Sequence, residues 1–214
     1  MSGKTLSNGK TTVALWDGDW HDLLSSMTGK KIDAIITDPP YELAEFPAEL
    51  LALTTGNIIT FCKPENQFKN FPANEYLFWV KTPSTKNFSR NCGRFVEMIM
   101  VRRNGTFNSW HWSQMTGVYD DRLIYPPVHP CEKPLSLIER LIRIYTNPGD
   151  VVFDPFMGSG TTAKACAITG RNFIGAEINK QYYELTNDFF RHVTPPLDTE
   201  SGDVVPAIEH ERGE

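Results

Sequence analysis

The sequence predicts a doubly wound α/β fold, in which a mostly parallel sheet carries helices on both faces. Three observations lead to this prediction. Short, nearly continuous apolar segments recur at 31–37, 57–62 and 151–154, which is typical of strands buried on both faces. Segments with helical spacing of apolar residues alternate with them. A glycine-rich turn follows residue 154 and opens a helical pattern, as in ligand-binding loops at the carboxyl edge of such sheets.

The composition is that of a globular domain. The 214 residues can build a substantial core, and 40% hydrophobic with 22% charged residues is ordinary for such a chain. No apolar segment approaches the roughly 18 residues of a membrane helix, and no signal peptide is recognisable, so we expect a cytoplasmic protein without a membrane partner. The four cysteines form no C-x-x-C pair, so we expect neither disulfides nor a bound metal.

The net charge of −5 is concentrated at the end of the chain. Residues 194–214 hold six acids against Arg212 alone, whereas residues 1–193 carry 20 charges of each sign. The end segment also has few large apolar residues, so it is predicted to be a disordered acidic tail after a single catalytic domain at 1–193.

Basic residues gather in the middle of the chain, where Glu97 is the only acid between residues 81 and 103. Two interpretations stay open on charge alone, a solvated loop or a loop that contacts phosphates. The candidates for nucleic-acid contact are Lys81, Lys86, Arg90 and Arg94.

Apolar spacing and turn residues predict the elements in order. The first half is expected to form a strand at 11–16, a helix at 20–26 with Asp19 as its N-cap, a strand at 31–37, a helix at 47–54 and a strand at 57–62. The second half is expected to form an antiparallel strand pair at 75–80 and 95–101, an irregular segment at 104–127, a helix from Pro134 to 146, a strand at 151–154, a helix to Thr169, a strand at 171–177 and a helix at 180–191.

The glycine-rich turn predicts a nucleotide-like cofactor. Gly158, Gly160 and Ala163 have G-x-G-x-x-A spacing, which permits a tight turn and close backbone approach to a ligand at a helix N-terminus. The next predicted strand ends in Glu177, an acid suited to ribose hydroxyls. Dehydrogenases and methyltransferases share this pattern. A dehydrogenase usually begins with its glycine loop, whereas here only about one strand follows, which argues against a dinucleotide oxidoreductase.

Motifs far apart in the sequence complete the pattern. They are Gly18-Asp19, Asp-Pro-Pro-Tyr at 38–41, Trp79-Val80-Lys81 with Glu97, His-Pro-Cys-Glu-Lys-Pro at 129–134, Asp-Pro-Phe-Met-Gly-Ser-Gly-Thr-Thr at 154–162 and Gly-Ala-Glu at 175–177. In this order the chain resembles the β class of DNA amino-methyltransferases, the permuted class in which the catalytic motif precedes the cofactor motif.

The resemblance implies a Rossmann-like methyltransferase sheet that binds S-adenosylmethionine and methylates a flipped base in DNA. It implies catalytic roles for Asp38, Pro39, Pro40 and Tyr41. It implies cofactor contacts for Asp19, His129, Lys133, Asp154, Phe156, Gly158, Ser159, Gly160, Thr161, Thr162 and Glu177. Structural roles stay open beside these: Asp19, Ser159, Thr161 and Thr162 also suit helix caps, Asp154 a strand end, and Phe156 the core.

The residue types fit this chemistry. An exocyclic adenine nitrogen is a poor nucleophile because its lone pair is delocalised into the ring. Acceptors aimed at its N–H groups, here the Asp38 carboxylate and the Pro39 carbonyl, oppose that delocalisation and stabilise positive charge. Pro40 stiffens the turn, and Tyr41 is expected to stack on a base swung out of the duplex.

The same resemblance leaves several points open. Asp38 favours adenine N6 over cytosine N4 as the target. The space for target recognition is short, so segments 82–94 and 104–127 are the expected DNA-contacting loops, with recognition that is loose or shared across a homodimer. A bacterial or phage enzyme is expected, linked to restriction or an orphan. RNA as substrate and a non-catalytic nucleic-acid-binding module on the same fold are the alternatives.

Overall fold

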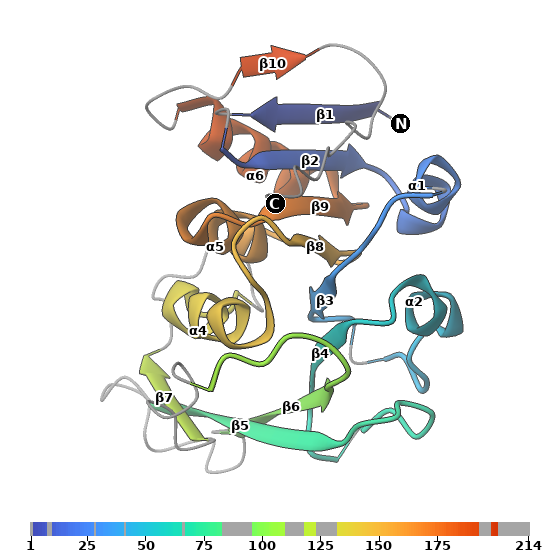
Figure 1. Cartoon of the computed structure of the whole chain (residues 1–214), viewed down its shortest axis with the longest axis vertical. Coiled ribbons are helices and arrows are strands. Elements are labelled where there is room, and N and C mark those ends of the chain that lie inside the picture. The colour runs from blue at the N-terminus through green and yellow to red at the C-terminus, as the bar shows by residue number, and fades with distance from the viewer. Residues whose placement is uncertain are drawn as a thin grey trace, which may run out of the picture.

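The computed structural model describes residues 2–7, 10–27, 29–40, 42–65, 67–82, 96–109, 118–122, 132–192 and 198–200. Within these ranges one mixed sheet runs through the molecule (Figure 1). Its strands are β1 (Ser2–Ser7), β2 (Thr12–Asp17), β3 (Ala34–Thr37), β4 (Asn57–Cys62), β5 (Glu75–Thr82), β6 (Val96–Arg102), β7 (Val118–Arg122), β8 (Val151–Asp154), β9 (Asn172–Glu177) and β10 (Asp198–Glu200). Their order across the sheet is β10-β1-β2-β9-β8-β3-β4-β6-β5-β7.

The centre of the sheet is parallel, as predicted. Strands β2, β9, β8, β3 and β4 pair in parallel, and the antiparallel strand β6 follows β4. The predicted antiparallel pair is confirmed, because β5 and β6 pair with Trp79 opposite Glu97. Strand β3 lies beside β8 although more than a hundred residues separate them in the chain. The predicted doubly wound α/β fold is therefore confirmed.

Helices cover both faces of the sheet. They are α1 (Trp20–Ser26), α2 (Ala48–Leu53), α4 (Leu135–Tyr145), α5 (Thr161–Thr169) and α6 (Lys180–His192). Helices α1 and α2 lie on one side, and α4, α5 and α6 pack on the other, so there are two hydrophobic clusters, one on each face (Figure 1). Among these described helices, none combines the length and the apolar character that crossing a bilayer requires.

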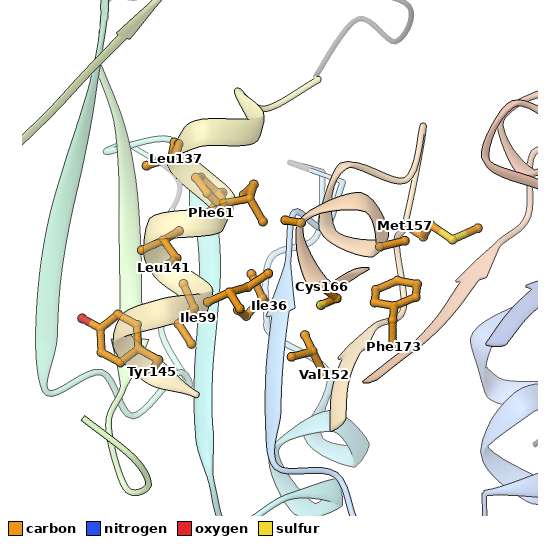
Figure 2. Close-up of a cluster of buried hydrophobic side chains, with 14 of the residues drawn as sticks. Ile36, Ile59, Phe61, Leu137, Leu141, Tyr145, Val152, Met157, Cys166 and Phe173 are labelled. Carbon is orange, nitrogen blue, oxygen red and sulfur yellow. The ribbon is translucent and has the colours of Figure 1, made fainter. Parts of the chain in front are cut away.

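Helix α4 shows how sequence spacing becomes packing. Its fully buried residues recur at helical spacing and include Leu137, Leu141 and Tyr145, which face Ile59 and Phe61 of β4 (Figure 2). Burying a leucine side chain of this kind contributes about 1.5–3 kcal/mol, so the stripe anchors the helix firmly. The segment just before α4 is thereby held against the sheet, and this segment carries Lys133.

Three strands were not expected from the sequence. Strand β1 pairs antiparallel with β2, and β7, which lies within the segment predicted as irregular, pairs in parallel with β5. Strand β10 lies within the predicted disordered tail and pairs with β1, so that prediction does not hold for residues 198–200. Each of these strands lies at or next to an edge of the sheet, where backbone hydrogen bonds to a neighbour replace an apolar pattern as the stabilising feature.

The parallel strands end at one edge of the sheet, and this geometry positions the site. Strand β3 ends at Thr37, directly before Asp38, and β8 ends at Asp154. Strand β9 ends at Glu177, opposite Asp17 of β2, so Gly18 and Asp19 emerge beside it. Ligands bind at this edge in open α/β sheets, and residues from four distant segments meet there.

Candidate active site

A cavity of about 460 Å³ lies at this carboxyl edge. Twelve of the residues predicted for catalysis or cofactor binding line it: Asp19, Asp38, Pro39, Pro40, Lys133, Asp154, Phe156, Gly158, Ser159, Thr161, Thr162 and Glu177. Gly160 does not line the cavity. The predicted residues Tyr41, His129, Lys86, Arg90 and Arg94 lie outside the described residues, as do the 82–94 loop except Thr82 and much of 104–127.

The glycine loop between β8 and α5 is tied to the end of β9. Oε2 of Glu177 accepts a 2.8 Å hydrogen bond from the Gly158 amide, and Oε1 accepts one of 2.7 Å from the Asn179 amide. Each carboxylate oxygen keeps a further lone pair for a ligand. Gly160 precedes α5 with φ of +78°, and a Cβ there would lie 2.5 Å from Thr186, so glycine is required for both backbone and space.

Asp154 is buried where β8 ends. Its Oδ1 accepts hydrogen bonds from the Thr37 hydroxyl at 2.8 Å and from the Phe156 amide at 3.1 Å. Burial raises the pKa of this carboxyl to about 7, and the hydrogen bonds from Thr37, Thr162 and Phe156 oppose that rise. Asp154 therefore fixes the relative positions of β3, β8 and the glycine loop as well as bordering the cavity.

Asp38 lies in the same cavity with one oxygen paired and one free. Its Oδ2 accepts a hydrogen bond from the Lys133 ammonium, and Lys133 lies 3.3 Å from Oε2 of Glu97. Oδ1 of Asp38 is buried and has no hydrogen-bond partner among the described residues. Burial raises the pKa of the Asp38 carboxyl, and the positive charge of Lys133 opposes the rise. The free oxygen is an acceptor held ready for a donor that enters the cavity.

The other end of the cavity is acidic and aromatic. Asp19 caps α1 as predicted, since its Oδ1 accepts a 2.8 Å hydrogen bond from the His21 amide, and this bond holds the pKa of Asp19 below its usual value. The rings of Trp20 and Phe156 meet edge to face with centroids 6.2 Å apart. Ile178 lines the cavity although 73% of it is exposed, so an apolar surface lies beside Glu177.

The sequence assigned no catalytic or binding role to Glu97, Thr37 or Trp20, yet each contributes to the site. Glu97 pairs with Lys81 and Lys133, Thr37 holds Asp154, and Trp20 lines the cavity wall. Glu97 had a signal in the sequence, because it is the single charge in the apolar segment 95–101, and a charge there requires a partner. Thr37 and Trp20 carried no comparable signal, since both fit an ordinary strand end and helix start.

The comparisons with known proteins agree with the geometry. Residues 58–188 match the family model described as DNA methylase, of the N6/N4 type. Type II methyltransferase M1.MboII of Moraxella bovis is 52% identical over 137 residues, which is 61% of this chain and 51% of that protein. DNA adenine methyltransferase YhdJ of Escherichia coli (strain K12) is 49% identical over 57 residues, 27% of this chain and 19% of that protein.

A solved structure extends the similarity over most of the chain. The crystal structure of the M1.HpyAVI-SAM complex is 30% identical, covers 83% of this chain and 99% of that one, and superposes with a TM-score of 0.66. The chain spans about half or less of the length of the two curated relatives named above. The family model alone covers more than half of the chain, and the resemblance found in the motifs is confirmed at the level of the family. The chain belongs to the N6/N4 family of DNA methylases.

Proposed function

We propose that this chain transfers a methyl group from S-adenosylmethionine to the exocyclic N6 of adenine in DNA. One observation carries the proposal: Oδ1 of Asp38 is a buried acceptor with no hydrogen-bond partner among the described residues, in a cavity that also contains the glycine loop and Glu177. An acceptor and a cofactor-sized space in one cavity are what direct transfer to an amino group needs.

The cavity fits the cofactor in its size and in the chemical type of its lining residues. Its volume lies in the range of about 300–1,000 Å³ that is usual for small-molecule sites. The carboxylate of Glu177 suits a ribose diol, and the wall of Trp20, Phe156 and Ile178 suits a purine. Ser159, Thr161 and Thr162 surround the N-terminus of α5, where hydroxyl and amide groups suit a carboxylate.

The chemistry at the other end rests on Asp38 and Pro39. When bound, the cofactor supplies an electrophilic methyl group on a sulfonium. Oδ1 of Asp38 accepts a hydrogen bond from one N–H of the target amino group, and the Pro39 carbonyl is the proposed acceptor for the other. Together they localise the nitrogen lone pair and stabilise the positive charge that develops on the base. Pro40 also lines the cavity, and two consecutive prolines hold these acceptors without an ordering cost.

The choice of base rests on the leading acid of the motif and on a relative. Asp38 stands where enzymes of the resembled class that act on adenine carry aspartate, and the similar protein YhdJ is a DNA adenine methyltransferase by name. Cytosine N4 is the second candidate, because the matching family includes both targets. The two amino groups are chemically alike, so Asp38 would act in the same way on either.

Contacts with DNA remain predictions from the sequence. Lys81 is a described residue, but its ammonium is paired with Glu97 and lies 4.9 Å from the Trp79 ring centroid, so it helps build the site itself. Flipping of the target base, stacking on Tyr41, phosphate contacts by Lys86, Arg90 and Arg94, and a homodimer belong to the same proposal, as do bacterial or phage origin and a cytoplasmic location.

Transfer of labelled methyl groups tests the proposal. Unmethylated duplex DNA is incubated with the protein and methyl-tritiated S-adenosylmethionine, with Asp38→Ala in parallel. We expect label in DNA with the unaltered protein and a loss of at least about 10²-fold in the variant, as for removal of a key transition-state contact. Calorimetry should show that both proteins bind the cofactor. Cofactor binding without transfer to DNA or RNA would favour the non-catalytic module instead.

A further inference from the structure

Four charged side chains form a continuous series that begins at Asp38, with two buried members in the middle and a partly buried one at each end. Lys133 bonds to Oδ2 of Asp38 and lies 3.3 Å from Oε2 of Glu97, and Lys81 bonds to Oε1 of Glu97. The side-chain exposures are 19% for Asp38, 6% for Lys133, 9% for Glu97 and 20% for Lys81. Two carboxylates and two ammonium groups balance, which is the condition for keeping such charges out of water.

The members of this series come from four separate segments. Asp38 follows β3, Lys133 precedes α4, Glu97 is in β6 and Lys81 is in β5. Glu97 is held by the sheet, because β6 is paired with both β4 and β5 and Glu97 itself lies opposite Trp79. A charge fixed by the sheet therefore holds the ammonium that contacts the catalytic carboxylate.

One ammonium is thus shared between two carboxylates. If Lys133 paired with Asp38 alone, its charge would withdraw electron density from Asp38 and weaken that carboxylate as an acceptor for the target amino group. If Lys133 were absent, Asp38 would be buried without a counter-charge and would favour its protonated form. The observed arrangement lies between these extremes, and Glu97 is the residue that produces it.

We propose that Glu97 is a positioning residue of the methyl-transfer centre. It divides the Lys133 ammonium between itself and Asp38, so that Lys133 favours the ionised form of Asp38 without weakening Oδ1 as an acceptor by its full charge. The inference rests on the proposed function, since it assigns Asp38 a role in methyl transfer. Glu97 does not contact the substrate in this account; it acts through Lys133.

Lys133 and Glu97 have opposite effects on the pKa of Asp38. Burial raises the pKa of Asp38. The positive charges of Lys133 and Lys81 lower this pKa, and the negative charge of Glu97 raises it. Within the described part of the chain, the Cys62 thiol on β4 and the Asp154 carboxyl on β8 also interact with Asp38. Burial raises the pKa of Cys62 to about 12, so this thiol stays neutral at working pH. Removing the charge of Glu97 must therefore lower the pKa of Asp38, and removing the charge of Lys133 must raise it.

The test measures kcat for methyl transfer against pH with Glu97→Gln and Lys133→Met. Transfer needs ionised Asp38, so the acid limb follows its pKa. We expect the limb to move by about one pH unit, downward in Glu97→Gln and upward in Lys133→Met, as for the loss of one nearby charge. The plateau of kcat should fall several-fold in Glu97→Gln with little change in the cofactor KM. Glu75→Gln is the matched control, since Glu75 is a partly buried, ion-paired carboxylate on β5 that lies opposite Val101.

Three results would overturn the inference: a Glu97→Gln profile that superposes on that of the unaltered protein, limbs that move in the same direction in both variants, or an equal shift in Glu75→Gln. Carbon-13 NMR of aspartate carboxyls, with Asp38→Asn for assignment, follows the same titration without DNA. If the unaltered protein transfers no methyl group, the proposed function fails. The NMR titration then decides this inference by itself, since opposite shifts support the coupling and unchanged values refute it.

Discussion

The backbone amide of Gly158 donates a 2.8 Å hydrogen bond to Oε2 of Glu177, and the Met157 amide donates one of 3.0 Å to the Ala176 carbonyl. These two bonds join the glycine loop after β8 to the carboxyl end of β9. Glu177 therefore has two functions in this account, since it shapes the loop and presents a carboxylate to the cavity. A ligand that binds Glu177 meets a loop whose position is already set.

Glu177→Ala should weaken binding of S-adenosylmethionine by about 10- to 100-fold, because hydrogen bonds to a charged group contribute roughly 1.5–3 kcal/mol. Isothermal titration calorimetry without DNA measures this directly. Glu49→Ala on α2 is the control, as Glu49 is an exposed acid in a helix that does not line the cavity. An unchanged dissociation constant in Glu177→Ala would remove Glu177 from the cofactor site.

Asp154 should make stability fall as pH rises. Its pKa is about 7 in the folded protein and near 3.8 when unfolded, so between these values the folded state binds more protons and unfolding becomes easier with increasing pH. Asp154→Asn cannot ionise. The unfolding free energy of the variant minus that of the unaltered protein should therefore increase by up to about 4 kcal/mol from pH 4 to pH 7.5. Urea denaturation at both pH values measures the difference, and an equal offset at the two pH values would contradict it.

Gly160→Ala should destabilise the fold through two separate effects. The positive φ costs a residue with a side chain about 1–2 kcal/mol, and the new Cβ would lie 2.5 Å from Thr186 Cγ2 on α6. Combining it with Thr186→Ala should relieve the contact but leave the backbone cost. A double-mutant cycle by thermal unfolding would then show favourable coupling between the two positions. Additive effects would mean that the loop moves away from α6 instead.

The sequence indicated where several cavity residues would meet, because these residues lie at the ends of strands or directly after them. Asp38, Asp154 and Glu177 each follow or end an apolar segment, and parallel strands place such ends on one edge of the sheet. Their meeting point was therefore predictable, although the ends of β3 and β8 at Thr37 and Asp154 are 117 positions apart in the chain.

The pairing of side chains was not predictable in the same way. The sequence suggested that Lys133 contacts the cofactor, whereas the structure directs its ammonium to Asp38 and Glu97; a cofactor contact by Lys133 stays a proposal. Which partner a buried lysine takes depends on the register between β5, β6 and β4, and no local pattern encodes that register. The edge strand β10 escaped prediction for a related reason, since only pairing with β1 makes Asp198–Glu200 extended.

Nucleoside mass spectrometry of methylated DNA shows which base receives the methyl group and whether Asp38 is required. Unmethylated DNA is incubated with the protein and S-adenosylmethionine, digested to nucleosides and compared with a reaction that contains Asp38→Ala. We expect N6-methyladenine with the unaltered protein alone. N4-methylcytosine would preserve the role of Asp38 and change the target base. Equal methylation by Asp38→Ala would contradict the account, because transfer would then proceed without the free acceptor on which it rests.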